Sequence, residues 1–441
     1  MTLAKPDISN SSGAKSKKVN SVADKAENFL VGDVPLTTIA QKFGTPAYVY
    51  DAGILKERVK LVQNALGSDV KILFALKANS NAMVAKTLRL AGTGAEVASA
   101  GEIAVAKAAG FDPEEIHFAG PGKTSLDLET AVAAKISCVN LESAGEADRL
   151  ARIAQQTGRK QGVAIRVQSF GSLQGSRMRM SGSGSRFGVP ATEVPALAQR
   201  LATDDAFEFR GLHTYGGTQC FDPEAWSASA RGLVELADQI EDDHGIRVNH
   251  LNFGGGFGVP LFQGDAEFDI YSAGDALRAI IDTPRGHRRK HYVELGRFIA
   301  APSGTYVARV TDVKVSDNTN HLVLDGGMHH HAAAAGMGSV IRRSYPMVVP
   351  DRPSEEPIVE YAISGPLCLP LDEFASSQKL PRLRVGDLLA ITSSGAYGLS
   401  YSPVLFLGHP LPAEVLVDGD QVQLVRRRGR PEDVLSGQVV S

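Results

Sequence analysis

One lysine stands where the chain could carry out amine chemistry. Lys77 closes the apolar run Lys71–Leu76 and is followed by Ala78–Asn81. A lysine at the carboxyl end of an early barrel strand points toward the catalytic face. Burial there lets its amine lose a proton and form a Schiff base with an aldehyde cofactor. A lysine at a strand end is more often a solvated charge, so the neighbouring motifs must decide between the two interpretations.

Two later motifs offer groups that suit such a cofactor. The glycine run Gly254–Gly256 directly follows a strand-like run. Glycines let backbone N–H groups approach a phosphate closely, although a tight turn explains the run equally well. Glu294–Arg297 ends a further strand-like run. A carboxylate there could accept a hydrogen bond from a protonated pyridine nitrogen, and an arginine could hold a phosphate or a carboxylate.

The elements that must position these groups alternate between strand and helix. Eight strand-like runs in roughly 250 residues, each followed by a helical pattern or a loop, predict an α/β fold built on a (β/α)8 TIM barrel. Periodicity alone leaves an open doubly wound sheet as the alternative. The expected strands are Lys71–Ala75, Ala95–Val97, Ile116–Phe118, Cys138–Asn140, Val163–Val167, Phe209–His213, His250–Phe253 and His291–Glu294.

The pattern changes after residue 300. Thr305–Ser316, Ile358–Ile363 and Gln421–Val425 alternate between apolar and polar residues and predict a second, β-rich domain of barrel or sandwich type. We expect a disordered tail over 1–27, the barrel over 28–300 with an N-terminal strand packing on the second domain, and the β-rich domain over 301–441. The Gly/Ser/Arg-rich stretch Ser169–Arg186 follows a barrel strand and is expected to be mobile.

Composition narrows the class of protein. Apolar residues make up 43% and charged residues 22% of 441 residues, and the net charge is −3. These values are typical of soluble globular proteins and suggest neither a nucleic-acid nor a membrane partner. The three cysteines form no CxxC pair, and the polar N-terminus lacks a secretory signal. We therefore expect a cytoplasmic enzyme without a structural metal.

Six motifs occur together in a recognisable order. They are Phe74–Asn79, His213, Gly254–Phe257, Glu294–Arg297, Gly365–Cys368 and Gly395–Gly398. Between about residues 30 and 425 the chain resembles the fold-type III decarboxylases that depend on pyridoxal 5′-phosphate (PLP), a family that includes diaminopimelate, ornithine and arginine decarboxylases. The resemblance implies a homodimer with shared active sites and an amino-acid substrate.

The resemblance also implies roles for individual residues. Lys77 would be the Schiff-base lysine, and Cys368 would come from the other subunit to protonate Cα, since a thiol is mostly protonated at neutral pH. Glu294 would keep the pyridine nitrogen protonated. The implied cofactor-binding residues are Lys77, His213, Gly254, Gly255, Gly256, Glu294, Gly296, Arg297 and Tyr397. The implied substrate-binding residues are Arg297, Asp372 and Tyr397.

Departures from the family pattern bear on the substrate. Leu369 stands where diaminopimelate decarboxylases have a glutamate that recognises the distal ammonium group of the substrate. Tyr215 replaces a histidine, so either His213 or Tyr215 could stack on the cofactor, and Glu96 replaces an aspartate. These changes resemble a divergent branch that includes the glutamyl-carrier-protein decarboxylase of butirosin biosynthesis. The resemblance implies an amino acid or a carrier-tethered aminoacyl group as the substrate.

Three alternatives remain at this point. The chain could be a meso-diaminopimelate decarboxylase of lysine biosynthesis, a racemase of similar fold, or a non-catalytic decarboxylase-like binding protein. The Gly365–Cys368 segment argues against the racemase, and retention of Lys77 and Cys368 argues against the non-catalytic protein. The run His329–His331 could line the active site, serve the fold, or bind a metal, although consecutive histidines rarely point at one ion.

Overall fold

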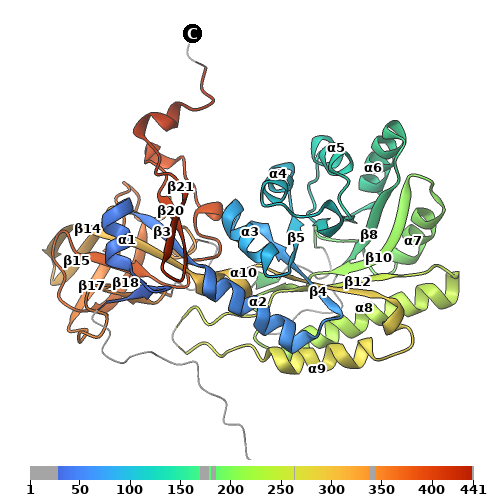
Figure 1. Ribbon diagram of the computed structural model, residues 1–441, viewed down its shortest axis with the longest axis horizontal. Helices are drawn as coiled ribbons and strands as arrows, with labels where there is room; N and C mark the ends of the chain where they lie inside the picture. Colours follow the sequence, from blue (N-terminus) through green and yellow to red (C-terminus); the bar gives the residue numbers. More distant parts are fainter. Residues whose placement is uncertain (1–27, 169–177, 180–184, 263, 338–342, 440–441) are drawn as a thin grey trace, which may run out of the picture.

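The computed structural model describes residues 28–168, 178–179, 185–262, 264–337 and 343–439. The tail expected over 1–27 and most of Ser169–Arg186 lie outside these residues. Figure 1 shows two parts side by side, a β-rich sheet structure and a barrel surrounded by helices. Among the described residues, no helix is both long and apolar enough to cross a membrane.

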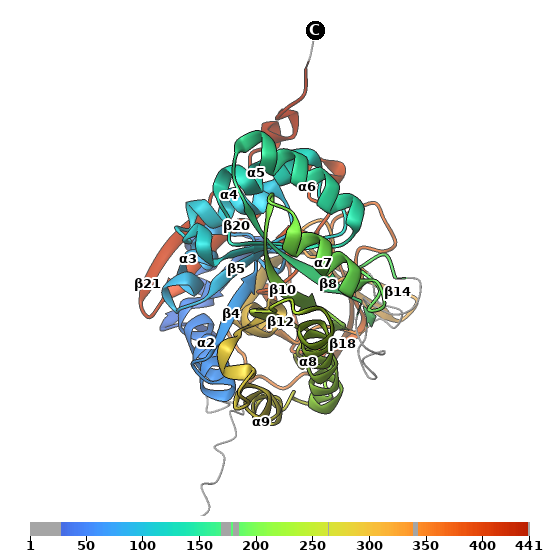
Figure 2. The ribbon, with the colours of Figure 1, turned by 90° about the vertical axis from the view of Figure 1, so that its right-hand side faces the viewer.

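Eight parallel strands close into a barrel, as the alternating pattern predicts. The order around the barrel is β10-β12-β13-β4-β5-β6-β7-β8. Figure 2 looks into this barrel, with its helices arranged around the strands. The strands are β4 (Val70–Ala75), β5 (Gly94–Val97), β6 (Ile116–Phe118), β7 (Cys138–Leu141), β8 (Gln161–Val167), β10 (Phe207–Thr214), β12 (His250–Gly255) and β13 (Lys290–Leu295). The open-sheet alternative is therefore wrong.

The barrel helices begin where short polar side chains cap them. Asn81, Ser99 and Ser143 each accept a hydrogen bond from a backbone N–H of the following helix, and Thr124 forms a capping box with Asp127. These caps fix the loops that leave the carboxyl ends of the strands. The helices are α2 (Ala52–Leu66), α3 (Ala82–Leu90), α4 (Ala100–Ala108), α5 (Ser125–Ala134), α6 (Ala144–Thr157), α7 (Val194–Thr203), α8 (Pro223–His244), α9 (Ile270–Ile281) and α10 (Arg297–Ala300).

The second part is a sheet in the order β18-β17-β15-β14-β3-β20-β21, with β19 pairing β14 and β16 off this path. Most neighbours are antiparallel, but β15 with β17 and β3 with β20 are parallel. The strands are β14 (Gly304–Ser316), β15 (Thr319–Leu324), β16 (Met347–Val348), β17 (Val359–Ser364), β18 (Glu373–Leu380), β19 (Leu388–Ile391), β20 (Ala413–Asp418) and β21 (Gln421–Arg426).

The N-terminal segment belongs to this sheet rather than to the barrel. The strand β3 (Ala47–Asp51) pairs with both β14 and β20. The helix α1 (Leu36–Phe43) lies against it and buries Leu36 and Ile39 in a small core with Val307 and Val415. A short hairpin, β1 (Leu30–Val31) with β2 (Val34–Pro35), precedes α1. The barrel is thus inserted between two neighbouring strands of one sheet.

Candidate active site

Lys77 lies just past the end of β4, in the short 3-10 turn Leu76–Ala78. Its Nζ donates to both carboxylate oxygens of Glu96, at 3.0 and 2.9 Å. Glu96 comes from β5, the neighbouring strand, and its side chain is 1% exposed. The lysine amine therefore stands at the catalytic end of the barrel with a buried carboxylate as its counter-ion.

The charges around Lys77 set its protonation. Burial by itself lowers the pKa of the Lys77 amine, but Glu96, Tyr397, Tyr215 and Glu294 together outweigh burial, and the pKa lies well above its usual value. Burial raises the pKa of Glu96, and the neighbouring ammonium offsets only part of that rise. Lysine and glutamate therefore form a neutral, tightly held pair.

Glu294 lies at the end of β13 and is held by two polar side chains. His213 Nε2 bonds its Oε2 at 3.1 Å, and Asn252 Nδ2 donates to its Oε1 at 2.8 Å. Burial would raise the pKa of Glu294, but the charge and hydrogen bond of His213 and the charge of Lys77 lower it to about 2. A carboxylate that stays ionised at this position suits a protonated pyridine nitrogen.

A pocket at the carboxyl ends of β4, β10, β12 and β13 collects these groups. A larger cavity of about 870 Å³ opens at the other end of the barrel, beside Asp69 and Tyr292, but barrel enzymes act at the carboxyl end. The smaller pocket is therefore the candidate site. Its lining consists of Ala75, Lys77, Tyr215, Thr218, Gly256, Phe257, Glu294, Leu295, Gly296, Arg297, Phe298 and Tyr397.

The lining of the pocket shows which of two rings, His213 or Tyr215, faces Lys77. Tyr215 lines it, and Lys77 Nζ lies 5.6 Å from the centre of the Tyr215 ring. His213 is 1% exposed, bonds Glu294 and does not line the pocket. Burial raises the pKa of the Tyr215 phenol to about 12, so this ring stays neutral. Of the two rings that the sequence leaves open, Tyr215 is therefore the one in position to stack on a cofactor.

The residues present fit a phosphorylated pyridine aldehyde. Gly254 and Gly256 adopt positive φ angles of 63° and 88°. A Cβ at Gly254, Gly255 or Gly256 would collide with a neighbouring backbone carbonyl, so this turn requires the glycines. The buried Nε of Arg297 has no hydrogen-bond partner among the described residues, which leaves a donor for an anion. Gly256, Gly296 and Arg297 line the pocket, whereas Gly254 and Gly255 shape the turn behind it.

Tyr397 reaches the pocket from the second domain of its own chain. Its backbone N–H donates to the carbonyl of Ala78 in the same chain, at 2.7 Å. Its ring packs on the Arg297 guanidinium at 4.4 Å, and its φ of 55° is uncommon in a non-glycine residue. The second domain therefore already completes one wall of the pocket within a single chain.

Cys368 and Asp372 lie elsewhere. Cys368 is exposed and does not line the pocket around Lys77. Asp372 is 3% exposed and accepts hydrogen bonds from the backbone N–H groups of Met328 and Leu367, at 2.6 and 2.8 Å. The Asp372 carboxylate holds the loop that carries Cys368 and does not line the pocket of its own chain, so its contact with substrate stays a prediction.

The histidine run serves the fold of the second domain. His330 bonds Tyr306 and the carbonyl of Pro410, and His331 bonds Ser394, whereas His329 stacks against His409. Burial lowers the pKa of His329 to about 4 and of His330 and His331 to about 3. None of the three lines the pocket. Within the described residues, no group of three or more potential ligands is arranged to hold a metal ion.

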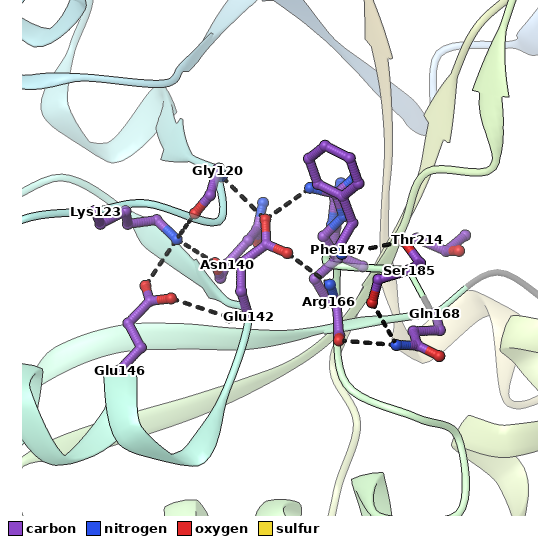
Figure 3. A network of polar contacts seen from close by, with 12 residues as sticks. Gly120, Lys123, Asn140, Glu142, Glu146, Arg166, Gln168, Ser185, Phe187 and Thr214 are labelled. Atoms are coloured by element: carbon purple, nitrogen blue, oxygen red, sulfur yellow. Dashed lines mark hydrogen bonds and ion pairs between the residues drawn. The ribbon is translucent and has the colours of Figure 1, made fainter. Parts of the chain in front are cut away.

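A second polar network fixes the rim of the barrel on the side of β6, β7 and β8 (Figure 3). The Glu142 carboxylate accepts hydrogen bonds from Arg166 and from the backbone of Gly120 and Gly188, at 2.7, 3.2 and 2.7 Å. Nearby, the buried amine of Lys123 donates to Glu146 and to two backbone carbonyls. Because these charges are buried and paired, removing one partner would leave an uncompensated charge in the barrel wall.

Several of these positions escape sequence reasoning. Asn252 binds Glu294, and the sequence indicates this role only by the position of Asn252 two residues before the glycine run. Thr218 lies in a short strand, β11 (Gly217–Thr218), that pairs with β9 (Met178–Arg179), and it lines the same pocket as Lys77. Glu102, at the start of α4, has a pKa raised to about 7 by burial and by the charge of Glu96. Tertiary structure alone brings these side chains together.

The fold and the site define a barrel enzyme with a lysine at the carboxyl end of a strand, in a pocket that suits an aldehyde cofactor. Residues 52–301 match the family model described as "Pyridoxal-dependent decarboxylase, pyridoxal binding domain". The chain belongs to the pyridoxal-dependent decarboxylases, so it is a PLP enzyme and a carboxy-lyase. The racemase and the non-catalytic alternatives are therefore set aside.

Relatives of known activity match along nearly the whole chain. An L-glutamyl-[BtrI acyl-carrier protein] decarboxylase from Niallia circulans is 35% identical over 92% of this chain and 96% of its own length. The diaminopimelate decarboxylase of Pseudomonas aeruginosa is 33% identical, over 94% and 97%. The crystal structure of the Helicobacter pylori diaminopimelate decarboxylase with L-lysine superposes with a TM-score of 0.83 at 26% identity, over 91% and 98%.

Proposed function

We propose that this decarboxylase acts on an aminoacyl substrate whose distal end is neutral, acidic or tethered to a carrier protein. The observation that supports this proposal is the loop that carries Cys368. Leu369 in that loop offers no charge, and Asp372 is buried under two backbone N–H groups. A distal ammonium group would find no counter-ion on either residue, and buried charges without partners are strongly disfavoured.

The 35% identity to a glutamyl-carrier-protein decarboxylase supports the same choice. A glutamyl group joined to its carrier through the side-chain carboxyl has no free charge at its distal end. The α-amino and α-carboxylate groups would then face Lys77 and Arg297. Diaminopimelate decarboxylases are also relatives over most of the chain, so the substrate must be decided by experiment.

The pocket residues divide the work of decarboxylation between them. PLP, when bound, supplies a ring that accepts the electron pair left behind as CO₂ departs. Lys77 would hold the cofactor covalently, and Glu294 would keep the ring nitrogen protonated. Tyr215 would pack on the ring face, and Tyr397 would orient the Arg297 guanidinium. Gly256, Gly296, Thr218 and Arg297 would bind the phosphate.

The active unit is proposed to be a homodimer with shared sites. Cys368 is exposed and lies outside the pocket of its own chain, so a second copy would have to present it. Cys368 of the partner subunit would give a proton to Cα after CO₂ leaves, since a thiol can act as a general acid. The site would then be complete only in the dimer.

Subunit mixing tests this arrangement. Lys77→Ala and Cys368→Ala homodimers should both be nearly inactive. Random reassortment should restore about a quarter of the wild-type activity, because half of the dimers are mixed and each mixed dimer has one intact site. Activity that stays absent in verified heterodimers would rule out shared sites. A mixture of two Cys368→Ala preparations serves as the control.

Substrate choice is tested by measuring CO₂ release. The panel contains meso-diaminopimelate, lysine, ornithine, arginine, glutamate and a glutamyl-carrier-protein conjugate. The conjugate should have the highest kcat/KM, and free diamines should be poor substrates. Lysine formed from diaminopimelate as the dominant product in direct competition would instead assign the chain to lysine biosynthesis.

A further inference from the structure

The ion pair of Lys77 with the buried Glu96 has a consequence for protons in the active site. An amine that attacks an aldehyde must first lose the proton of its ammonium form. In the structure that proton lies between Lys77 Nζ and the two oxygens of Glu96, at 3.0 and 2.9 Å. The Glu96 side chain is 1% exposed and the Lys77 side chain 37% exposed, so the face of the amine toward Glu96 is shielded from bulk water while its other face opens to the pocket.

The other ionisable groups that act on Lys77 are poor proton acceptors. Glu294, at the end of β13, is held ionised by His213 and Asn252, with its pKa lowered to about 2. Tyr215, which follows β10, already carries its phenolic proton because burial raises its pKa to about 12. Tyr397, from the second domain, is a phenol packed on Arg297. Glu96, from β5, is the carboxylate that touches the amine.

Charge balance points to the same residue. If Lys77 lost its charge while Glu96 stayed ionised, Glu96 would remain as a buried anion with Glu294 and Glu102 acting on it or near it. Buried carboxylates that face other negative charges favour the protonated form. Transfer of the proton along the existing hydrogen bond keeps the pair neutral before and after the step.

We propose that Glu96 accepts the proton of Lys77 when the amine becomes a nucleophile and returns it when the lysine is displaced from the cofactor. In the first direction an N–H bond of the ammonium breaks and an O–H bond forms on Glu96; the second direction reverses both. The inference rests on the proposed role of Lys77 as the cofactor-binding lysine. Glu96 is then a catalytic residue for capture and release of the cofactor's aldehyde carbon rather than for loss of CO₂.

The test follows displacement of Lys77 from the cofactor in the full-length, loaded enzyme. Hydroxylamine is added at a series of pH values, and the loss of the visible absorbance of the lysine-bound cofactor is timed. In the wild type the rate should depend on a single carboxyl group that must be protonated. Glu96→Gln should slow displacement roughly 10²-fold at neutral pH and abolish that dependence, because general acid catalysis is typically of this size.

A matched control removes the other lysine–carboxylate pair of the same strand. Lys71, near the start of β4, bonds Glu115 at 2.6 Å far from the pocket. Glu115→Gln should leave both the displacement rate and its pH profile unchanged. Glu96→Asp should keep a pH-dependent rate, because it retains a carboxyl group. A pH-dependent rate in Glu96→Asp would show that proton transfer, rather than packing, sets the displacement rate. This variant is the test if Glu96→Gln does not fold.

Two results would overturn the assignment of Glu96. One is a Glu96→Gln enzyme with the wild-type rate and pH profile. The other is an equally slowed displacement rate, without pH dependence, in Glu96→Asp and Glu96→Gln. That result would indicate that Glu96 affects displacement through packing alone. If the proposed role of Lys77 were itself wrong, the failure would look different: borohydride reduction would not fix the cofactor to the Lys77 peptide of the wild type.

Discussion

Lys77→Ala should abolish covalent attachment of the cofactor and lower kcat/KM by about 10⁴-fold or more. Among the described residues no other lysine lines the pocket, and the buried lysine near the barrel rim, Lys123, is bound to Glu146 and two carbonyls. The loss should appear in two measurements. Borohydride reduction followed by peptide mass analysis should find no modified lysine, and CO₂ release should fall to near background.

The control for Lys77→Ala must preserve the charge that Glu96 requires. Lys77→Arg keeps a cation beside Glu96, but a guanidinium does not deprotonate and cannot link to an aldehyde. It should therefore be as inactive as Lys77→Ala while unfolding closer to the wild-type temperature. Substantial turnover by either variant, with a reducible cofactor bound, would show that another residue is the cofactor lysine.

meso-Diaminopimelate should react with kcat/KM about 10³-fold lower than the true substrate. The distal ammonium group would meet Leu369, and burial of an unpaired charge is among the strongest means of rejecting a substrate. The main objection, that Asp372 could swing in and pair with the ammonium, conflicts with its geometry. Its two oxygens hold the backbone of Met328 and Leu367, and that loop would have to open first.

A change of one residue makes this prediction sharper. Leu369→Glu should raise kcat/KM for meso-diaminopimelate by roughly tenfold or more, since it restores an ion-pair partner, and should not improve use of the carrier conjugate. Leu371→Glu, on the exposed neighbouring position of the same loop, is the control for added charge. Equal diaminopimelate rates in wild type and Leu369→Glu would show that Leu369 does not determine specificity.

The sequence predicts the barrel well because strand-like runs alternate with helical patterns, and the carboxyl ends of such strands share one face of a barrel. Lys77 and Glu294 are found by this rule, since both lie at or beside the carboxyl end of a strand. The positions of Asp372 and Tyr397 do not follow from this rule. Both lie in turns of the second domain, and their contacts with Met328 and Ala78 depend on how distant segments pack. Spacing along the chain carries no information about such contacts.

The choice between His213 and Tyr215 shows a subtler limit. The two residues are neighbours on alternate positions, and either ring could serve a cofactor by type. What separates them is the end of β10, where Thr214 is its last residue and Tyr215 begins the following turn. His213 stays inside the barrel beneath Glu294, while Tyr215 turns toward Lys77. The position of the end of β10, to within one residue, determines which ring faces the pocket. Sequence patterns place strand ends less accurately than that.

The insertion of the barrel between β3 and β14 gives the two domains a double connection. Tyr50 pairs with Gly304 across these strands, so the chain enters and leaves the barrel at adjacent points. A single linker would act as a swivel, whereas two adjacent covalent connections oppose twisting of one domain on the other. Tyr397 approaches Lys77 across this same junction. The pocket wall formed by Tyr397 of the second domain should therefore keep its position through turnover. Motion of the active site should be confined to loops.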